Sequence, residues 1–125
     1  MLHDRHWTIE EANEALEDLA PRIRELRDHL ESLRTPEAAA RLAEVAAVPG
    51  GGYPGKDLAA STVRLALGLH DLSDDEIVVR DLERGLIDFP SLLGGEEIYL
   101  CWLLDEPAVG HWHAPESGFG GRQPL

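Results

Sequence analysis

The longest regular pattern in the sequence is a row of apolar residues near the N-terminus, spaced alternately three and four positions apart. The row consists of Ile9, Ala12, Leu16, Leu19, Ile23, Leu26, Leu30 and Leu33. This spacing places every member on one side of an α-helix, and a row of about three and a half heptads needs a second helix to cover it. The sequence therefore predicts a long N-terminal helix that packs against at least one other helix.

Local signals mark where this helix begins and ends. Thr8-Ile9-Glu10-Glu11 has the pattern of a capping box, in which Thr8 accepts from an early helix N–H and Glu11 reaches back to Thr8. Pro21 lies opposite the apolar row, so we expect a bend near residues 17–21 without the loss of a core contact. Thr35-Pro36 ends the helix and begins a second one over residues 37–48.

A segment rich in glycine and proline, residues 49–56, separates the second helix from a third. It predicts a flexible loop, because such a composition favours turns over regular structure. Its three consecutive glycines lack the Gly-Lys-Ser/Thr sequence of a phosphate-binding loop, so we interpret them as part of a linker. Asp57 is a good N-cap for a third helix, which we expect to end near Leu72.

The pattern changes to strand-like runs in the last part of the chain. The runs cover residues 77–80, 86–89, 98–104 and 109–113, with turn signals at Arg84-Gly85, Pro90, Gly94-Gly95 and Glu106-Pro107. Both faces of the run 98–104 are apolar, which indicates a central strand covered on both sides. We therefore predict an α+β fold, with a kinked N-terminal helical hairpin or bundle packed on a small antiparallel β-meander.

Length and composition favour one domain, residues 1–125. We expect it to consist of a helical part (1–72), a sheet (76–113) and a C-terminal tail (114–125). In the tail, Phe119 and Leu125 are expected to contact the sheet. The 24 acidic and 11 basic residues give a net charge of -13, which argues against binding to nucleic acid or to anionic membranes. The single cysteine, Cys101, excludes an internal disulfide. No signal peptide or apolar membrane span is evident, so we expect a cytoplasmic protein.

Four blocks of the sequence together resemble a known family. They are Trp7-Thr8-Ile9-Glu10-Glu11-Ala12-Asn13, Asp81-Leu82-Glu83-Arg84-Gly85-Leu86-Ile87-Asp88-Phe89-Pro90, Leu100-Cys101-Trp102, and Trp112-His113 with Gly118-Phe119-Gly120-Gly121-Arg122. With these blocks the chain resembles the prokaryotic family known as domain of unknown function 2203. The resemblance covers both ends of the chain well and residues 35–75 poorly.

The family carries no established activity, so the resemblance supports the boundaries of the segments and points to particular positions. The positions within its motifs are Asp81, Asp88, Trp102, Glu106, His113, Gly118 and Arg122. At His111 the family pattern has an aromatic residue, and His3 and His6 are not part of it. A site built on these three histidines would therefore be peculiar to this protein.

The sharpest chemical feature is His111-Trp112-His113-Ala114-Pro115-Glu116. Residues two apart on a strand face the same side, so His111 and His113 would reach one metal ion, with Glu116 as a third ligand from the following loop. Zinc and iron are the divalent metals that such ligands suit. The alternative is a hydrogen-bonded, half-buried His113 with His111 on a solvated strand edge.

Other polar residues are candidates with structural alternatives. His3 and His6 would add metal ligands if the N-terminus lies beside His111 and His113. Asp88 and Asp81 are candidates for a general acid and base, or they cap turns. Arg122 would bind an anionic ligand or form a structural ion pair. We interpret Cys101 as a small core residue, because no activating histidine is adjacent to it in the sequence.

Two functions remain, and no complete catalytic motif decides whether the protein is an enzyme. The first is a small metal-binding protein, or a metalloenzyme, with the His-x-His and carboxylate site. The second is a non-enzymatic interaction module without metal, in which the apolar row pairs with a second copy or with a partner helix. A small-molecule ligand facing Arg122 is a third, weaker option. Residues 76–125 carry nine acids and three bases. This excess of negative charge makes the C-terminal part the most favourable place for a bound cation.

Overall fold

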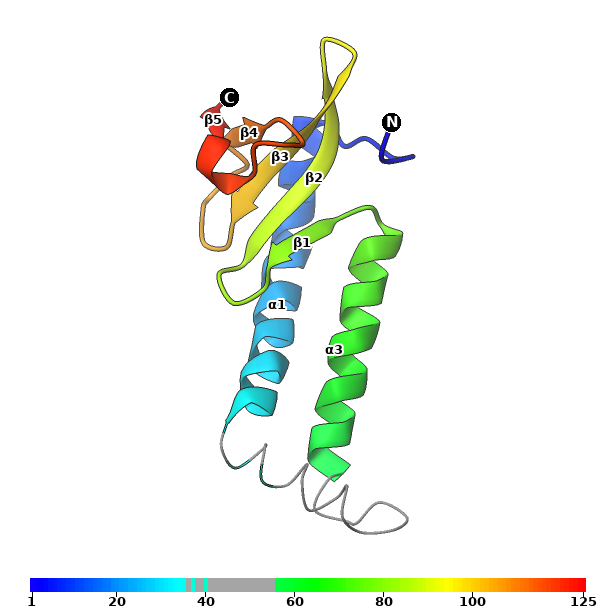
Figure 1. Ribbon diagram of the computed structural model, residues 1–125, viewed down its shortest axis with the longest axis vertical. Helices are drawn as coiled ribbons and strands as arrows, with labels where there is room; N and C mark the ends of the chain where they lie inside the picture. The colour runs from blue at the N-terminus through cyan, green and yellow to red at the C-terminus, as the bar shows by residue number, and fades with distance from the viewer. Residues whose placement is uncertain (36, 38–39, 41–55) are drawn as a thin grey trace.

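The structure is a computed structural model that describes residues 1–35, 37, 40 and 56–125 (Figure 1). The described elements are α1 (Ile9–Arg34), α3 (Lys56–Asp74), β1 (Val78–Asp81), β2 (Leu86–Leu93), β3 (Glu96–Leu103), β4 (His111–His113), the 3-10 helix η2 (Phe119–Gly121) and β5 (Gln123–Pro124). Helices precede strands, which confirms the predicted α+β class. The predicted helix 37–48 and loop 49–56 lie outside the described residues, apart from Glu37, Ala40 and Lys56.

Helix α1 begins with the predicted capping box. Glu11 N donates to Thr8 Oγ1 at 3.1 Å, and Thr8 N donates to Glu11 Oε1 at 3.0 Å. The helix is continuous through Pro21, and the predicted bend at residues 17–21 stays a prediction. The apolar row packs inside this chain, because its members Ala12, Leu16, Leu19, Ile23 and Leu26 are all buried.

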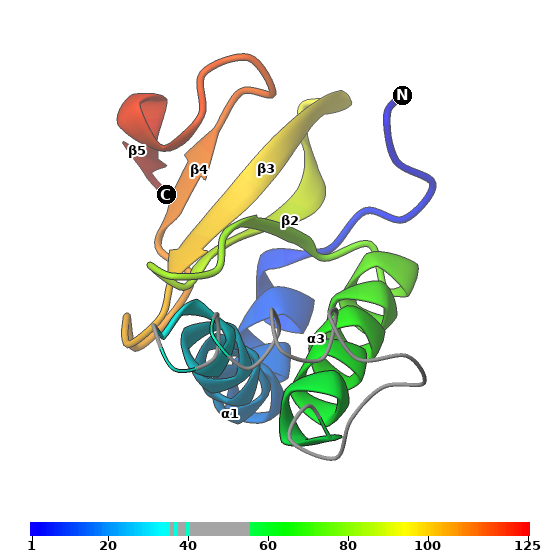
Figure 2. The same cartoon turned by 60° about the horizontal axis from the view of Figure 1, so that its bottom comes forward.

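Helix α3 runs beside α1 in both views (Figures 1 and 2). The two helices approach closely at Gly68, where an added Cβ would lie 2.3 Å from Leu26 Cδ2. Gly68 therefore permits this close packing, and a larger residue there would have to displace the end of the Leu26 side chain. Among the described residues, neither α1 nor α3 is long and apolar enough to cross a membrane.

The strands form one five-stranded antiparallel sheet in the order β1-β2-β3-β4-β5, so the predicted meander is confirmed. The sequence did not predict β5, which pairs Gln123 and Pro124 with β4 and brings the tail to the sheet edge (Figure 2). Leu125 N also donates to Gly110 O at 2.9 Å. The tail is therefore held by backbone pairing as well as by side chains.

The turn predicted at Pro90 is wrong, because Pro90 lies inside β2 and pairs with Tyr99. Strand β1 pairs with β2 only as far as Asp88, so Pro90 has no β1 partner. Its carbonyl instead accepts a hydrogen bond from Trp7 N at 2.6 Å. The missing N–H of Pro90 points to the same side as this carbonyl, so the ladder with β3 loses nothing.

The two faces of the sheet have different partners. One face supplies Ile87, Phe89, Ile98, Leu100 and Trp102 to a core shared with α1 and α3. Figure 2 shows both helices on that one side of the sheet. The central strand β3 is buried on both faces from Ile98 to Trp102, as the sequence predicted. We call the face turned away from the helices the outer face.

Candidate metal centre

The register of the central strands gathers polar side chains on the outer face. Asp88 on β2 pairs with Cys101 on β3, which pairs with His111 on β4. Tyr99 pairs with His113 in the neighbouring row. Because residues paired across strands point to the same side, all of these side chains lie on the outer face.

Three of these side chains form a compact buried cluster. Asp88, Cys101 and His113 are 1%, 0% and 2% exposed. Each offers one potential ligand atom, and the three atoms lie within 4.8 Å of one another. Asp88 Oδ2 is 2.8 Å from His113 Nε2 and also accepts from Arg80 Nε at 2.8 Å. We call Asp88, Cys101 and His113 the buried cluster.

Hydrogen-bond partners hold most polar atoms of His113 and Asp88 in the buried cluster. His113 Nδ1 lies 2.8 Å from the carbonyl oxygen of Ala114, and Nε2 lies 2.8 Å from Asp88. Both partners can accept a hydrogen bond, so each ring nitrogen of His113 lies beside an acceptor. Asp88 Oδ1 is buried and has no hydrogen-bond partner among the described residues. That oxygen is therefore available to a ligand.

Cys101 is a neutral thiol in this environment. Burial, followed by the neighbouring Asp88 carboxylate, raises the pKa of the thiol to about 12. Each nitrogen of His113 already contacts another group, Ala114 O or Asp88 Oδ2. A cysteine nucleophile needs a lowered pKa and a base, so this arrangement does not support one. A bound metal ion would change this, because coordination deprotonates a thiol.

The structure places His111 and Glu116 outside the buried cluster. His111 Nδ1 is in close contact with Arg122 Nη2, and Arg122 donates to Glu106 Oε2 at 2.7 Å. Glu106 Oε1 also accepts from Leu103 N at 2.7 Å. Arg122 therefore forms the structural ion pair that was one of its two predicted roles. Glu116 is exposed on the turn after β4.

Asp81 and Asp88 lie in different environments, although the sequence proposed them together. Asp81 Oδ1 accepts from the backbone N–H of Arg84 at 3.2 Å. This is the turn-capping contact that was the alternative to a catalytic role. Asp88 alone of the two belongs to the buried cluster.

Comparison with known proteins adds a family. A family model described as "Uncharacterized conserved protein (DUF2203)" matches residues 5–125. The chain belongs to this DUF2203 family. No curated protein and no solved structure matches it. The matched range includes the whole buried cluster of this DUF2203 protein, whereas His3 precedes it.

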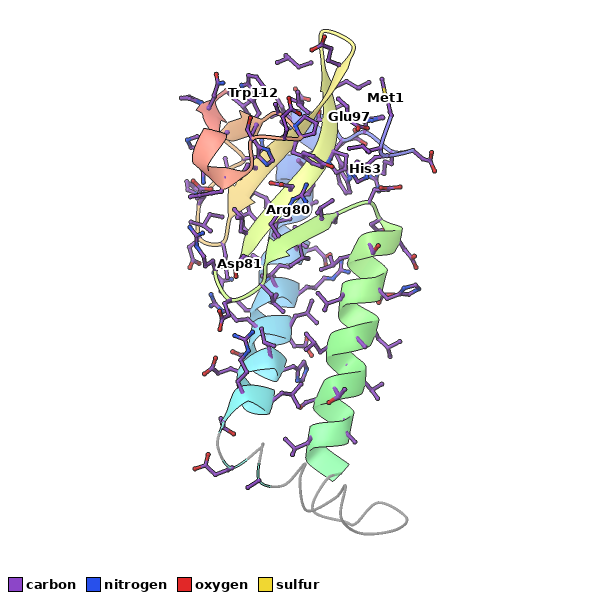
Figure 3. The ribbon with its side chains drawn as sticks, viewed as in Figure 1. Met1, His3, Arg80, Asp81, Glu97 and Trp112 are labelled. Carbon is purple, nitrogen blue, oxygen red and sulfur yellow. The ribbon has the colours of Figure 1, made fainter. Side chains whose placement is uncertain are left out.

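The two N-terminal histidines contact the sheet but do not join the buried cluster. His3 Nδ1 lies 2.6 Å from Glu76 Oε2, and His3 Nε2 lies 2.7 Å from Tyr99 Oη. His6 Nε2 lies 2.8 Å from Glu97 Oε2. Figure 3 shows His3 and Glu97 near Met1, beside the sheet. His3 reaches the cluster indirectly, through Tyr99.

Sequence reasoning missed two residues of this DUF2203 protein's site: Cys101 as a ligand, and Tyr99. A signal for Cys101 was present in Gly94-Gly95, because two glycines between strands favour a two-residue hairpin turn. Both glycines have positive φ, 60° and 83°, as that turn requires. The turn pairs Leu93 with Glu96, and counting back along both strands brings Asp88 opposite Cys101.

Proposed function

We propose that this protein binds a divalent transition metal, zinc or iron, through Asp88, Cys101 and His113. The proposal keeps His113 from the sequence prediction and replaces His111 and Glu116 by Asp88 and Cys101. One observation carries it: a carboxylate, a thiol and an imidazole from three adjacent strands lie within 4.8 Å of one another. Mixed sulfur, nitrogen and oxygen donors suit zinc or iron and disfavour magnesium and calcium.

The distances support this assignment. Two ligands of a tetrahedral zinc ion lie about 3.3–3.8 Å apart when the bonds are about 2.0–2.3 Å long. The contact of 2.8 Å between Asp88 Oδ2 and His113 Nε2 would have to open only slightly, or Asp88 would coordinate through its unpartnered Oδ1. In the second case Oδ2 keeps its bond to Arg80. His113 would bind through Nε2 while Nδ1 donates to Ala114 O, a common outer contact of metal-bound histidine.

Metal binding would also rearrange the charges. A thiolate and a carboxylate neutralise a dication, and His113 then binds as a neutral ring. Coordination would release the proton of the Cys101 thiol, because the raised pKa keeps this thiol neutral without a metal. The affinity should therefore rise with pH, by about tenfold per pH unit for the proton that the thiol loses.

The buried cluster supports metal binding more directly than catalysis. Three protein ligands leave a fourth coordination position, which is the arrangement of catalytic zinc sites. All three side chains are buried, however, so a substrate would reach that position only after an outer layer opens. The proposal keeps the expected cytoplasmic location, where a thiol ligand stays reduced.

Elemental analysis of protein purified without an affinity tag tests the proposal. We expect about one zinc or iron per wild-type chain, and loss of the metal in Cys101→Ser, His113→Gln and Asp88→Asn. The matched controls are His111→Gln and Glu116→Gln, which alter the residues first predicted as ligands and should keep the metal. Wild-type protein that stays metal-free after incubation with zinc, or controls that lose the metal, would contradict this ligand set.

We also propose self-association as a second function. The surface that pairs with a second copy would lie on α3 and not on the apolar row of α1. Most of the apolar row on α1 is already covered within the chain. On α3, Val63 and Leu67 are 55% and 58% exposed. On α3 no acidic residue lies between Leu58 and His70, which limits the repulsion between two copies at a net charge of -13, although Glu25 and Asp71 line the same pocket as Leu67. Sedimentation should show a dimer that Leu67→Asp dissociates, and a wild-type monomer would refute it.

A further inference from the structure

The N-terminal strap, which we define as residues 1–6, is attached to the sheet through polar contacts. The backbone N–H groups of Leu2 and His3 donate to the two carboxylate oxygens of Glu97, at 2.9 and 3.1 Å. His6 Nε2 contacts the same carboxylate at 2.8 Å. The side chains of Met1 and Leu2 are exposed. The strap therefore adds little to the apolar core, and its position depends on these hydrogen bonds.

His3 links the strap to two further groups. One ring nitrogen contacts Glu76 and the other contacts the hydroxyl of Tyr99, at 2.6 and 2.7 Å. Glu76 has a φ of 56°, a left-handed conformation that is unusual for a residue other than glycine. Trp7 Nε1 donates to the Glu76 carbonyl at 3.2 Å and helps to hold it in place. This conformation ends α3, because Ile77 N donates to Leu72 O at 2.9 Å and Glu76 N donates to Ser73 O at 3.0 Å, the pattern of a left-handed helix C-cap.

Tyr99 connects this arrangement to the buried cluster. It is buried, and its ring stacks on His113 at a centroid distance of 5.4 Å and an interplanar angle of 30°. The Arg80 guanidinium lies 4.7 Å from the centre of the Tyr99 ring. A continuous series of contacts thus runs from Glu76 through His3 and Tyr99 to His113.

We propose that the N-terminal strap is a hydrogen-bonded cover that holds Tyr99 on His113 and sets the rate at which a metal ion enters and leaves the buried cluster. The proposal rests on the metal-binding function proposed above. Trp7 is buried and anchors the chain directly after the strap. Residues 1–6 can therefore detach while the core stays folded, in the way that segments with few apolar contacts open locally. In this arrangement Tyr99 is a positioning residue for His113.

The rate of zinc transfer to an excess of chelator tests the cover. His3→Ala removes the contacts to Glu76 and Tyr99, and we expect zinc to leave about tenfold faster, the effect of losing a partly buried hydrogen bond or two. His70→Ala is the matched control, because His70 is an exposed histidine on α3. Its rate should equal that of the wild type. An unchanged rate in His3→Ala would overturn the proposal.

Tyr99→Phe separates positioning from general destabilisation. It keeps the ring that stacks on His113 and removes the hydroxyl that His3 contacts. We expect it to speed zinc release about as much as His3→Ala, and the double variant to release zinc no faster than either single variant. Additive rates would show that the two residues act separately, which would overturn the linked arrangement.

A second measurement needs no metal. Nitration of Tyr99 by tetranitromethane, followed by peptide mass mapping, reports how accessible the ring is in metal-free protein. We expect at least about tenfold faster nitration in His3→Ala than in the wild type or His70→Ala. If the wild type binds no zinc, the metal-binding function fails by itself. The nitration rate then tests by itself whether the strap covers Tyr99. Equal rates in all three proteins would overturn the cover.

Discussion

Replacing Asp88 by alanine should destabilise the metal-free protein by about 3 kcal/mol. Asp88 Oδ2 is shared by two partners, Arg80 Nε and His113 Nε2, each at 2.8 Å. The Arg80 side chain is 41% exposed, so it can turn to water when the carboxylate is removed. Its part of the loss should resemble that of an exposed ion pair, about 0–1 kcal/mol.

His113 accounts for most of the expected loss. It is buried under Tyr99 and cannot reach water. Without Asp88 its Nε2 has no partner, and an unpaired buried polar nitrogen costs about 2–3 kcal/mol. For a chain of this length, a total of about 3 kcal/mol corresponds to a fall in Tm of roughly 10 °C. Arg80→Ala should cost about 1 kcal/mol or less, since His113 keeps its partner.

Urea unfolding followed by tryptophan fluorescence measures both variants, because Trp7 and Trp102 are buried in the core. The measurement should be made with chelator present, so that bound metal does not add to the stability of the wild type. The reasoning would be refuted if Asp88→Ala lost less than about 1 kcal/mol, or no more than Arg80→Ala. In either case the buried contact between Asp88 and His113 would not be a stabilising one.

Three further outcomes follow from the same structure. Since burial raises the pKa of Cys101 to about 12, its thiol should react with a disulfide reagent at pH 8 about a thousandfold more slowly in folded than in unfolded protein. The hydrogen bond from His6 lowers the pKa of Glu97 from 4.5 to about 2. Glu97 should therefore stabilise the strap above about pH 4.5 and lose this effect as the pH falls toward 2. The amide NMR shift of Leu2 should change over the same pH range, and Glu97→Gln should abolish this change. Gly85→Ala should lower the free energy of unfolding in urea by about 2 kcal/mol, because Gly85 has a φ of 71° and an added Cβ would lie 2.4 Å from Leu104 Cβ. Gly94→Ala should lower it less, because Gly94 also has a positive φ but has open space around it.

Local patterns predicted most of the fold. The capping box at Thr8 and the apolar row of α1 depend on residues within one or two helical turns, and the structure confirms the helix they predict. The strand runs and the meander likewise follow from alternation and short turns. The turn predicted at Pro90 was wrong because two distant features allow a proline inside β2. These are the end of β1 and the contact with Trp7, which lies 83 positions earlier in the chain. Contacts of that range leave no local signal.

The buried cluster was predicted less completely for the same reason. His113 and Asp88 were recognised from motifs, but a partner from another strand requires the register. The turn at Gly94-Gly95 predicts the pairing of Asp88 with Cys101. The longer connection between β3 and β4 does not predict that Tyr99 pairs with His113. His111 was misjudged because spacing shows which side of a strand a residue faces, and gives no indication that Arg122 returns from the tail to contact it.

Placing the buried cluster in the middle of a sheet costs free energy, because polar groups lose their hydration there. A buried carboxylate such as that of Asp88 often contributes no more stability than a well-packed apolar residue would, because desolvation offsets its attraction to its partners. The inner face of the same strands is filled by Ile87, Leu100 and Trp102, which carry no such cost. Asp88 also keeps one buried oxygen without a hydrogen-bond partner. A ligand that binds this oxygen, the thiol and the imidazole would satisfy the whole group, and a divalent metal ion is the simplest ligand that does so.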